Sequence, residues 1–168
     1  KENLDVKGDL VNKKDIQAEG NVTIGKDATN QGRLLSDKEL KIKGNTDNSG
    51  TLYGKDKISI DKNLTNTNNV QTSGDLLAKD TINTGTIITE GNITLGILDN
   101  SGEITSNKKL TTITLENRSG AKISTGEGIQ NNGTRNLGEI NTNDNFVISG
   151  NLENYSVMNR GGLLSGKN

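Results

Sequence analysis

Residues 40–57 read LKIKGNTDNSGTLYGKDK, and this stretch holds one complete copy of the pattern that decides the fold. It contains three triplets, L-K-I, T-D-N and L-Y-G, in which a polar or aromatic residue separates two residues suited to burial. Residues i and i+2 of a β-strand point to the same face, so each triplet predicts a short strand with two inward side chains. The triplets are separated by Gly, Asn, Asp and Lys residues that favour turns. The stretch therefore predicts three strands joined by three corners.

The same unit recurs along the chain every 17 to 19 residues. The first inward residue of each copy is aliphatic or Phe: Leu4, Val22, Leu40, Ile58, Leu76, Ile93, Leu110, Ile129, Phe146 and Leu164. One such unit cannot bury its own apolar side, whereas stacked units bury a continuous core. We therefore predict an all-β, right-handed parallel β-helix (a solenoid) of about nine coils of 17–19 residues, with three short strands per coil.

A left-handed β-helix of hexapeptides is the main structural alternative. Leu4, Leu10 and Ile16 are six residues apart, and this spacing persists to Ile88. That fold, however, places a small residue two positions before each aliphatic one, whereas the first strand here often carries two aliphatic residues, as in I-S-I at 58–60. Coils of 17 and 19 residues also interrupt a six-residue period. These departures favour the right-handed helix.

An asparagine occupies the inward position before the second corner of nearly every coil. Identical amides held in register form hydrogen-bonded ladders. We predict a structural ladder of Asn12, Asn30, Asn48, Asn66, Asn100, Asn117, Asn136 and Asn154. In the fifth coil the sequence I-N-T-G (82–85) loses one residue near this corner, so Asn83 or Thr84 is expected there, with a kink or a weakened coil. An inward residue is expected four positions after each asparagine, which is Ala121 in the seventh coil.

The composition argues against several classes of site. The chain has 20 basic and 21 acidic residues, a net charge of −1, and neither histidine nor cysteine. Interspersed charges of both signs provide no footprint for nucleic acid. No apolar run approaches the roughly 20 residues of a membrane span, so no membrane insertion is expected. Carboxylates such as Asp27 and Asp61 lie at corners beside Lys26 and Lys62, as in solvated turns. We expect no cofactor, no metal and no enzymatic activity.

Asparagine also occurs in Asn-x-Ser/Thr triplets, which are acceptor sequences for N-glycosylation. Asn117 and Asn154 belong to the predicted ladder, where a glycan would break the coil. Asn21, Asn63 and Asn92 lie at corners and are the candidate acceptors.

The chain is expected to be an internal part of a longer rod. Its first residues, KENLDVKG (1–8), lack an initiator Met and the charged-then-apolar pattern of a signal peptide. The first and last coils show no capping pattern that would cover an exposed strand edge. We therefore expect residues 1–168 to form one continuous segment of β-helix.

With units that read L-x-I…L-x-N-x-G-x-I-x-S/T-x-G, the chain resembles the filamentous haemagglutinin repeats of two-partner secretion exoproteins. The clearest copies are LTNTNNVQTSGDL (64–76) and LDNSGEITSNKKL (98–110). The resemblance implies a long right-handed β-helix that is secreted through an outer-membrane transporter of the two-partner type and displayed at the bacterial cell surface.

The resemblance also implies two roles for such a rod. One is the shaft of an adhesin that mediates or projects attachment to a receptor on a host or bacterial surface. The alternative is the stalk of a contact-dependent growth-inhibition protein that delivers a toxin. A β-helical enzyme acting on polysaccharides is less favoured, because the chain has no clustered carboxylates and no insertion that could wall a cleft.

Overall fold

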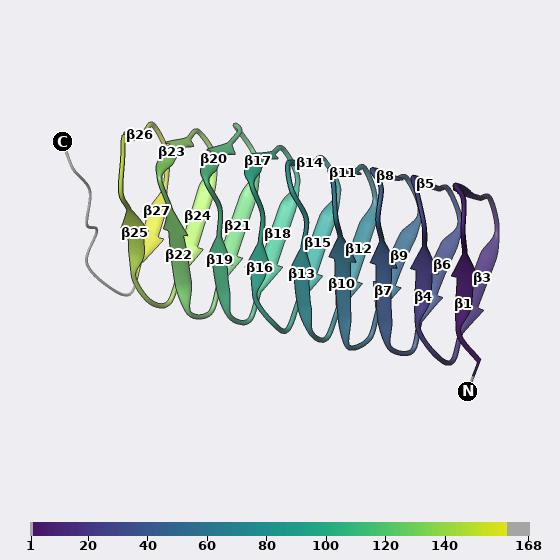
Figure 1. Cartoon of the computed structure of the whole chain (residues 1–168). Helices are drawn as coiled ribbons and strands as arrows, with labels where there is room; N and C mark the ends of the chain where they lie inside the picture. Colours follow the sequence, from purple (N-terminus) through teal and green to yellow (C-terminus); the bar gives the residue numbers. More distant parts are fainter. Residues whose placement is uncertain (1, 161–168) are drawn as a thin grey trace.

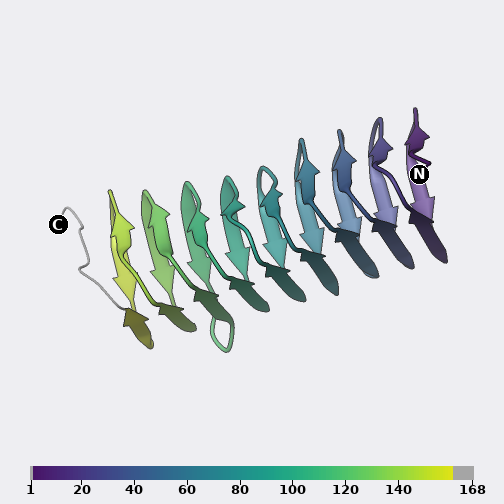
Figure 2. The same ribbon diagram turned by 90° about the horizontal axis from the view of Figure 1, so that it is seen from below.

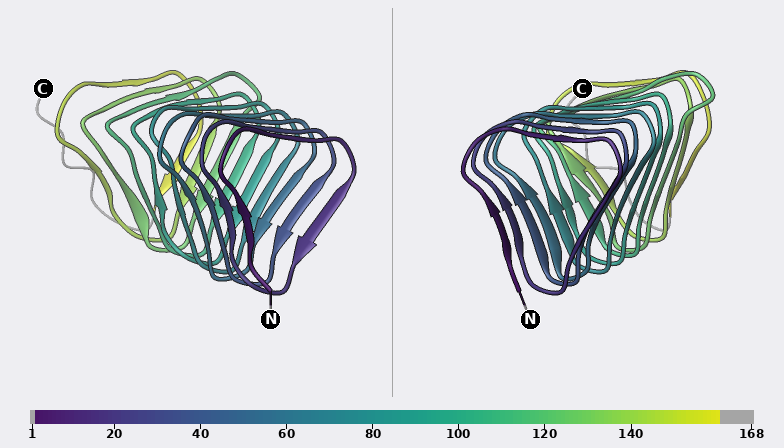
Figure 3. Two further views of the ribbon diagram at one scale, coloured as in Figure 1. Left: turned by 45° about the vertical axis from the view of Figure 1, so that its right-hand side comes forward. Right: turned by 90° about the vertical axis from the view of Figure 1, so that its right-hand side faces the viewer.

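The computed structural model describes residues 2–160, which form a parallel β-solenoid (Figure 1). The described part of the chain contains 27 strands in three sheets of nine. Each coil contributes one strand to each sheet, as the triplets predict. Seen from the N-terminal end, the chain runs clockwise as it recedes from the viewer, so the solenoid is right-handed (Figure 3). The predicted fold class is confirmed.

The three sheets run along the three sides of the rod. The first sheet contains β1 (Leu4–Val6), β4 (Val22–Ile24), β7 (Glu39–Ile42), β10 (Lys57–Ile60), β13 (Asp75–Leu77), β16 (Ile93–Thr94), β19 (Lys109–Thr111), β22 (Gly128–Asn131) and β25 (Phe146–Ile148). The second sheet contains β2 (Leu10–Asn12), β5 (Ala28–Asn30), β8 (Thr46–Asn48), β11 (Leu64–Asn66), β14 (Thr81–Asn83), β17 (Ile97–Asn100), β20 (Thr114–Asn117), β23 (Gly133–Asn136) and β26 (Leu152–Asn154). The third contains β3 (Asp15–Ala18), β6 (Arg33–Ser36), β9 (Thr51–Gly54), β12 (Asn69–Thr72), β15 (Thr86–Thr89), β18 (Glu103–Ser106), β21 (Lys122–Thr125), β24 (Glu139–Thr142) and β27 (Met158–Arg160).

Successive coils stack in parallel register. In the first sheet the predicted starting residues pair with one another from Leu4 to Phe146 without a slip. The predicted start of a tenth coil, Leu164, lies outside the described residues. A strand held in register on both sides exposes no free backbone edge, so each inner coil depends on its two neighbours.

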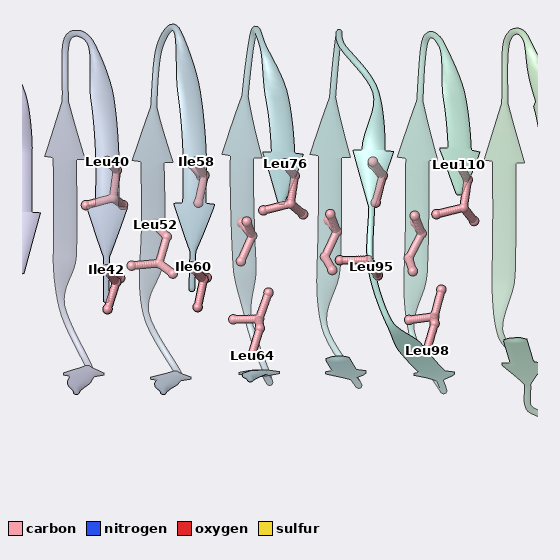
Figure 4. Packing of buried hydrophobic residues seen from close by; sticks show 14 of the residues in the cluster. Leu40, Ile42, Leu52, Ile58, Ile60, Leu64, Leu76, Leu95, Leu98 and Leu110 are labelled. Carbon is pink, nitrogen blue, oxygen red and sulfur yellow. The ribbon is translucent and has the colours of Figure 1, made fainter. Parts of the chain in front are cut away.

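The core is a set of aliphatic columns inside the three sheets. Side chains alternate between interior and surface along the strands, as in β7 and β10. Leu40 and Ile58 lie in one column and Ile42 and Ile60 in another, each at most 2% exposed (Figure 4). Burial of such a side chain stabilises the fold by about 2 kcal/mol. The columns therefore stabilise the stack only where the register is maintained.

The fifth coil loses its residue at the first corner, between the first and second strands. Leu76 and Thr81 are five residues apart, whereas Ile58 and Leu64, their partners in the fourth coil, are six apart. The prediction of a loss near the second corner, with a kink or weakened coil, is therefore wrong. The shortened corner is absorbed outside the sheets: the backbone N–H of Lys79 still donates to the previous coil, to Lys62, at 2.9 Å.

This shortening also ends the six-residue spacing. Ile82 and Ile88, which that spacing would place inside, are 51% and 39% exposed. Their neighbours Thr81 and Ile87 are buried instead. A loss of one residue reverses the face on which every following side chain of a strand lies, and the chain compensates by shifting its inward residues by one.

The seventh coil gains residues at the second corner. The loop 118–121 protrudes from the even row of corners (Figure 2), and Gly120 adopts a φ of 80°, a conformation that favours glycine. As a result Ile123, rather than Ala121, pairs with Ile104 of the previous coil. The predicted position of Ala121 on the third strand is therefore wrong, although its side chain is buried beneath the loop.

Candidate functional site

An asparagine ladder runs through the interior along the second sheet. Each ladder asparagine donates from Nδ2 to Oδ1 of the next, over 2.8–2.9 Å at all eight steps. The ladder consists of Asn12, Asn30, Asn48, Asn66, Asn83, Asn100, Asn117, Asn136 and Asn154. The eight predicted members are all present. Asn83 is the ninth, and its two bonds of 2.8 Å show no weakening.

Each amide also bonds to the backbone of the second corner. Asn48, for example, donates to the carbonyl oxygens of Gly50 at 3.0 Å and of Asn69 in the next coil at 2.9 Å. Most ladder side chains are at most 4% exposed, and Asn154 in the last described coil is the exception. Buried amides must have hydrogen-bond partners, so the ladder satisfies its own polar groups while it ties each corner to the next.

Thr84, the other candidate for the fifth coil, lies outside the ladder. Its side chain is exposed at the second corner, and Oγ1 contacts the carbonyl oxygen of Asn66 at 3.4 Å. Thr84 follows the inward Asn83 directly and therefore points to the opposite face.

Two further columns of Asp and Asn stabilise the corners from outside. At the first corner, Oδ1 of Asp9, Asp27 and Asn45 each accepts the backbone N–H of the equivalent residue one coil later, at 3.1, 2.7 and 3.4 Å. Asp80 accepts from Ile97 in the same way. These carboxylates were expected only as solvated turn residues. Their recurrence at one position of each coil was the signal that they bond between coils.

A similar column precedes the first strand of each coil. Oδ1 of Asn3 and Asp75 accepts the backbone N–H of Asn21 at 2.9 Å and of Asn92 at 2.7 Å. Inside the third corner, serine and threonine side chains bond to the backbone; Ser36 Oγ, for instance, donates to Gly20 O at 2.8 Å. Each of the three corners therefore has side chains that satisfy its backbone groups.

The glycosylation candidates belong to these outer columns. Asn21 and Asn63 are exposed, and Asn92 is half-buried. Asn92 Nδ2, the atom that carries an N-linked glycan, donates to Asp75 Oδ1 at 3.3 Å. Asn21 Oδ1 accepts the backbone N–H of Glu39 at 3.2 Å. The three acceptors stay a prediction, with Asn21 and Asn63 the more accessible pair.

A row of ion pairs lies on the outer face of the second sheet. Arg118 binds Asp99 through two bonds of 2.6 Å, and Arg135 lies 3.1 Å from Glu116 and 3.5 Å from Glu153. The hydrogen bond and the charge of Asp99 raise the pKa of Arg118 above its ordinary value. Exposed pairs contribute little to stability, so this row mainly gives the face its polar, charged character.

The outer face of the third sheet differs, because one of its columns contains no charged residue. The column, named the uncharged track below, consists of the second outward position of each strand: Gln17, Leu35, Tyr53, Gln71, Ile88, Thr105, Ser124 and Asn141. At the sixth to eighth coils the track borders a shallow groove of about 450 Å³. The groove is lined by hydroxyl, amide and glycine residues alone, including Ser106, Asn107, Thr125 and Asn143.

Within residues 2–160 no group of three or more Asp or Glu side chains is arranged to hold a metal ion. The same residues include no helix that is long and apolar enough to cross a membrane. Comparison with protein-family models, with curated proteins and with solved structures found no match for this chain.

Proposed function

We propose that this chain is part of the structural shaft of a large secreted bacterial surface adhesin, which projects or mediates attachment to a host or bacterial cell. The rod supports this role because its coils repeat without an inserted domain over the described residues. A solenoid extends in one dimension and presents long, regular faces, which suits a spacer that holds a binding surface away from the cell.

The observation that carries this proposal is the continuity of the asparagine ladder. The ladder passes through coils of 17, 18 and 19 residues with steps of 2.8–2.9 Å throughout. Differences in coil length are confined to corners, so inward side chains keep their register. A shaft that transmits force needs this property, because a single broken coil would be the place where the rod fails.

The contacts of the rod also fit export through a two-partner transporter of the outer membrane. The strand pairs link each coil to the coils directly before and after it, so folding can proceed one coil at a time as the chain emerges. The chain has no cysteine, so no disulfide can form before export. We therefore propose that the protein is secreted and displayed at the cell surface, where it binds a receptor.

The stalk of a toxin-delivery protein is the second candidate role. It draws on the same continuous rod, and the activity then resides in another part of the parent protein. A growth-competition assay between producing and non-producing bacteria distinguishes the two roles: killing of neighbours supports the stalk, and attachment without killing supports the adhesin.

The proposal is tested by deletions in the parent protein within its own bacterium. Removing residues 22–75 deletes three whole coils and joins Asn21 to Leu76, which keeps every column in phase. Removing residues 22–66 instead deletes two and a half coils and breaks the register. We expect the in-phase deletion to retain surface labelling by antibody and attachment, and the out-of-phase deletion to lose both. Attachment that is unaffected by the out-of-phase deletion, or a parent protein confined to the cytoplasm, would overturn the proposal.

A further inference from the structure

The uncharged track is unusual for the surface of this chain. Lys, Arg, Asp and Glu make up 24% of the residues, and the inward positions are almost entirely uncharged, so charges are concentrated on the outside. The equivalent column of the second sheet includes Asp47, Asp99, Glu116, Arg135 and Glu153. The third sheet carries none in its track from Gln17 to Asn141.

The strand register aligns the track along the rod. Tyr53 pairs with Gln71, Ile88 with Thr105, and Ser124 with Asn141. In-register side chains of parallel strands form a straight row with a spacing of about 4.8 Å. The row combines hydroxyl and amide groups, which both donate and accept hydrogen bonds, with the apolar surfaces of three side chains. Tyr53 adds one aromatic ring, half-buried against the sheet.

The groove at the sixth to eighth coils gives the track a concave end. Its lining offers hydroxyl groups from Thr105 and Ser124 and amides from Asn107 and Asn143. Thr125, which also lines the groove, is 95% buried (5% exposed), and its Oγ1 has no hydrogen-bond partner among the described residues. A buried hydroxyl without a partner costs free energy, and a polar ligand that supplies the missing bond recovers it.

This chemistry selects one class of ligand. An anionic chain or a phosphate surface would need cations, and the track has none. A second copy of the rod would need a broad apolar area of roughly 600–1,000 Å² on each partner, and the track is one side chain wide with Leu35, Tyr53 and Ile88 well separated by polar groups. A neutral, hydroxyl-rich chain satisfies both the hydrogen-bonding groups and the apolar faces.

We propose that the uncharged track binds a linear neutral polysaccharide that lies along the rod, with the groove at the sixth to eighth coils as its main subsite and Tyr53 as a stacking platform. A hexose unit has about the length of one strand spacing, about 4.8 Å, so consecutive sugars meet consecutive coils. This inference deepens the proposed function by naming the ligand class, and it rests on that function only for display of the rod at a surface.

The test is an NMR titration of the full 168-residue chain with cellohexaose, mannohexaose and xylohexaose, and with hexagalacturonate as an anionic chain of equal length. We expect at least one neutral hexasaccharide to shift the backbone amide signals of Thr105 and Ser124 and the side-chain amide signals of Asn141. We expect hexagalacturonate to bind at least about tenfold more weakly.

A pair of matched variants locates the site. Ser124→Lys places a charge beside the groove, and Thr111→Lys makes a comparable change at an outward, half-buried position of the first sheet in the same coil. We expect Ser124→Lys to weaken binding about tenfold and Thr111→Lys to leave it unchanged, with both chains retaining the dispersed spectrum of the folded solenoid. Tyr53→Ala should weaken binding without moving the shifts at the groove.

Three results would overturn the proposal. They are the absence of shifts with all neutral hexasaccharides, equal binding of hexagalacturonate, and equal loss of binding in both lysine variants. Sedimentation that shows a dimer dissociated by Ser124→Lys would instead assign the track to self-association. None of these results affects the surface-display experiment with the parent protein, so the two proposals fail independently.

Discussion

Replacing Asn83 with alanine removes one member of the asparagine ladder at its centre. The change deletes the bond that Asn66 donates to Asn83 and the bond that Asn83 donates to Asn100, both 2.8 Å long. It also deletes the weaker bonds from Asn83 Nδ2 to the carbonyl oxygens of Gly85 and Glu103, at 3.1 and 3.3 Å. Two polar groups, one on each side, then lose a partner inside the rod.

The expected loss of stability follows from these bonds. Two buried ladder bonds contribute about 2 kcal/mol, and a buried amide left without a partner costs about 1–3 kcal/mol more. Asn66 keeps its bonds to Asn68 O and Thr86 O, which limits the second cost to its lower end. We therefore expect Asn83→Ala to lower the free energy of unfolding by about 3 kcal/mol.

The assay is urea denaturation followed by far-ultraviolet circular dichroism, with hydrogen exchange to locate the weakened coils. The control is Asn68→Ala, which makes the same chemical change at an exposed second corner, where Nδ2 forms one bond of 3.1 Å to Ser49 O. This control should lose about 1 kcal/mol or less. Equal losses in both variants would show that the ladder does not stabilise the rod and would refute the reasoning.

Two other predictions concern the core. Leu64→Lys places a charge at a side chain that is 1% exposed and should lower the free energy of unfolding by at least about 4 kcal/mol, whereas Thr65→Lys at the next, outward position should change it by less than about 1 kcal/mol. Equal unfolding midpoints in these two variants would contradict the assigned faces of β11. The double change Asn131→Leu and Thr134→Val should raise the free energy of unfolding by about 1 kcal/mol in the same assay, because it removes a buried pair whose Asn131 Oδ1 has no partner among the described residues. A loss of stability would show that this pair contributes more than its burial costs.

The period of the fold could be predicted because inward and outward residues alternate so strictly. The triplet ending in Asn48 recurs with little change, and a period near 18 leaves no helical reading. The ladder could be predicted for the same reason, since one residue type recurs at one inward position. Handedness, strand number and the eight expected asparagines all follow from this regularity.

The exact course of the irregular coils could not be predicted, because the corners resemble one another in composition. Glycine, Asn and Asp occur at each corner, so nothing in the letters around Asn83 showed that the missing residue belonged to the first corner. Ala121 and Ile123 are both apolar and two apart, so both fit the inward face of a strand. The structure separates them because the loop at Gly120 turns with a positive φ.

Contacts between coils were the other feature beyond sequence reasoning. Asp99 and Arg118 are 19 residues apart, and their pairing depends on the extra residues of the loop that carries Arg118. The uncharged track likewise becomes a row only when Tyr53 and Gln71 are in register. Such surfaces belong to the stack of coils and not to any one copy of the repeat.

The most direct test of the central claim is an NMR measurement of contacts between the side-chain amide protons of the ladder. The account predicts a contact between each asparagine and the next at all eight steps from Asn12 to Asn154, including both steps at Asn83, with slow exchange against solvent at the buried positions. Rapidly exchanging amides, or contacts that stop at the fifth coil, would contradict a continuous right-handed solenoid held together by this ladder.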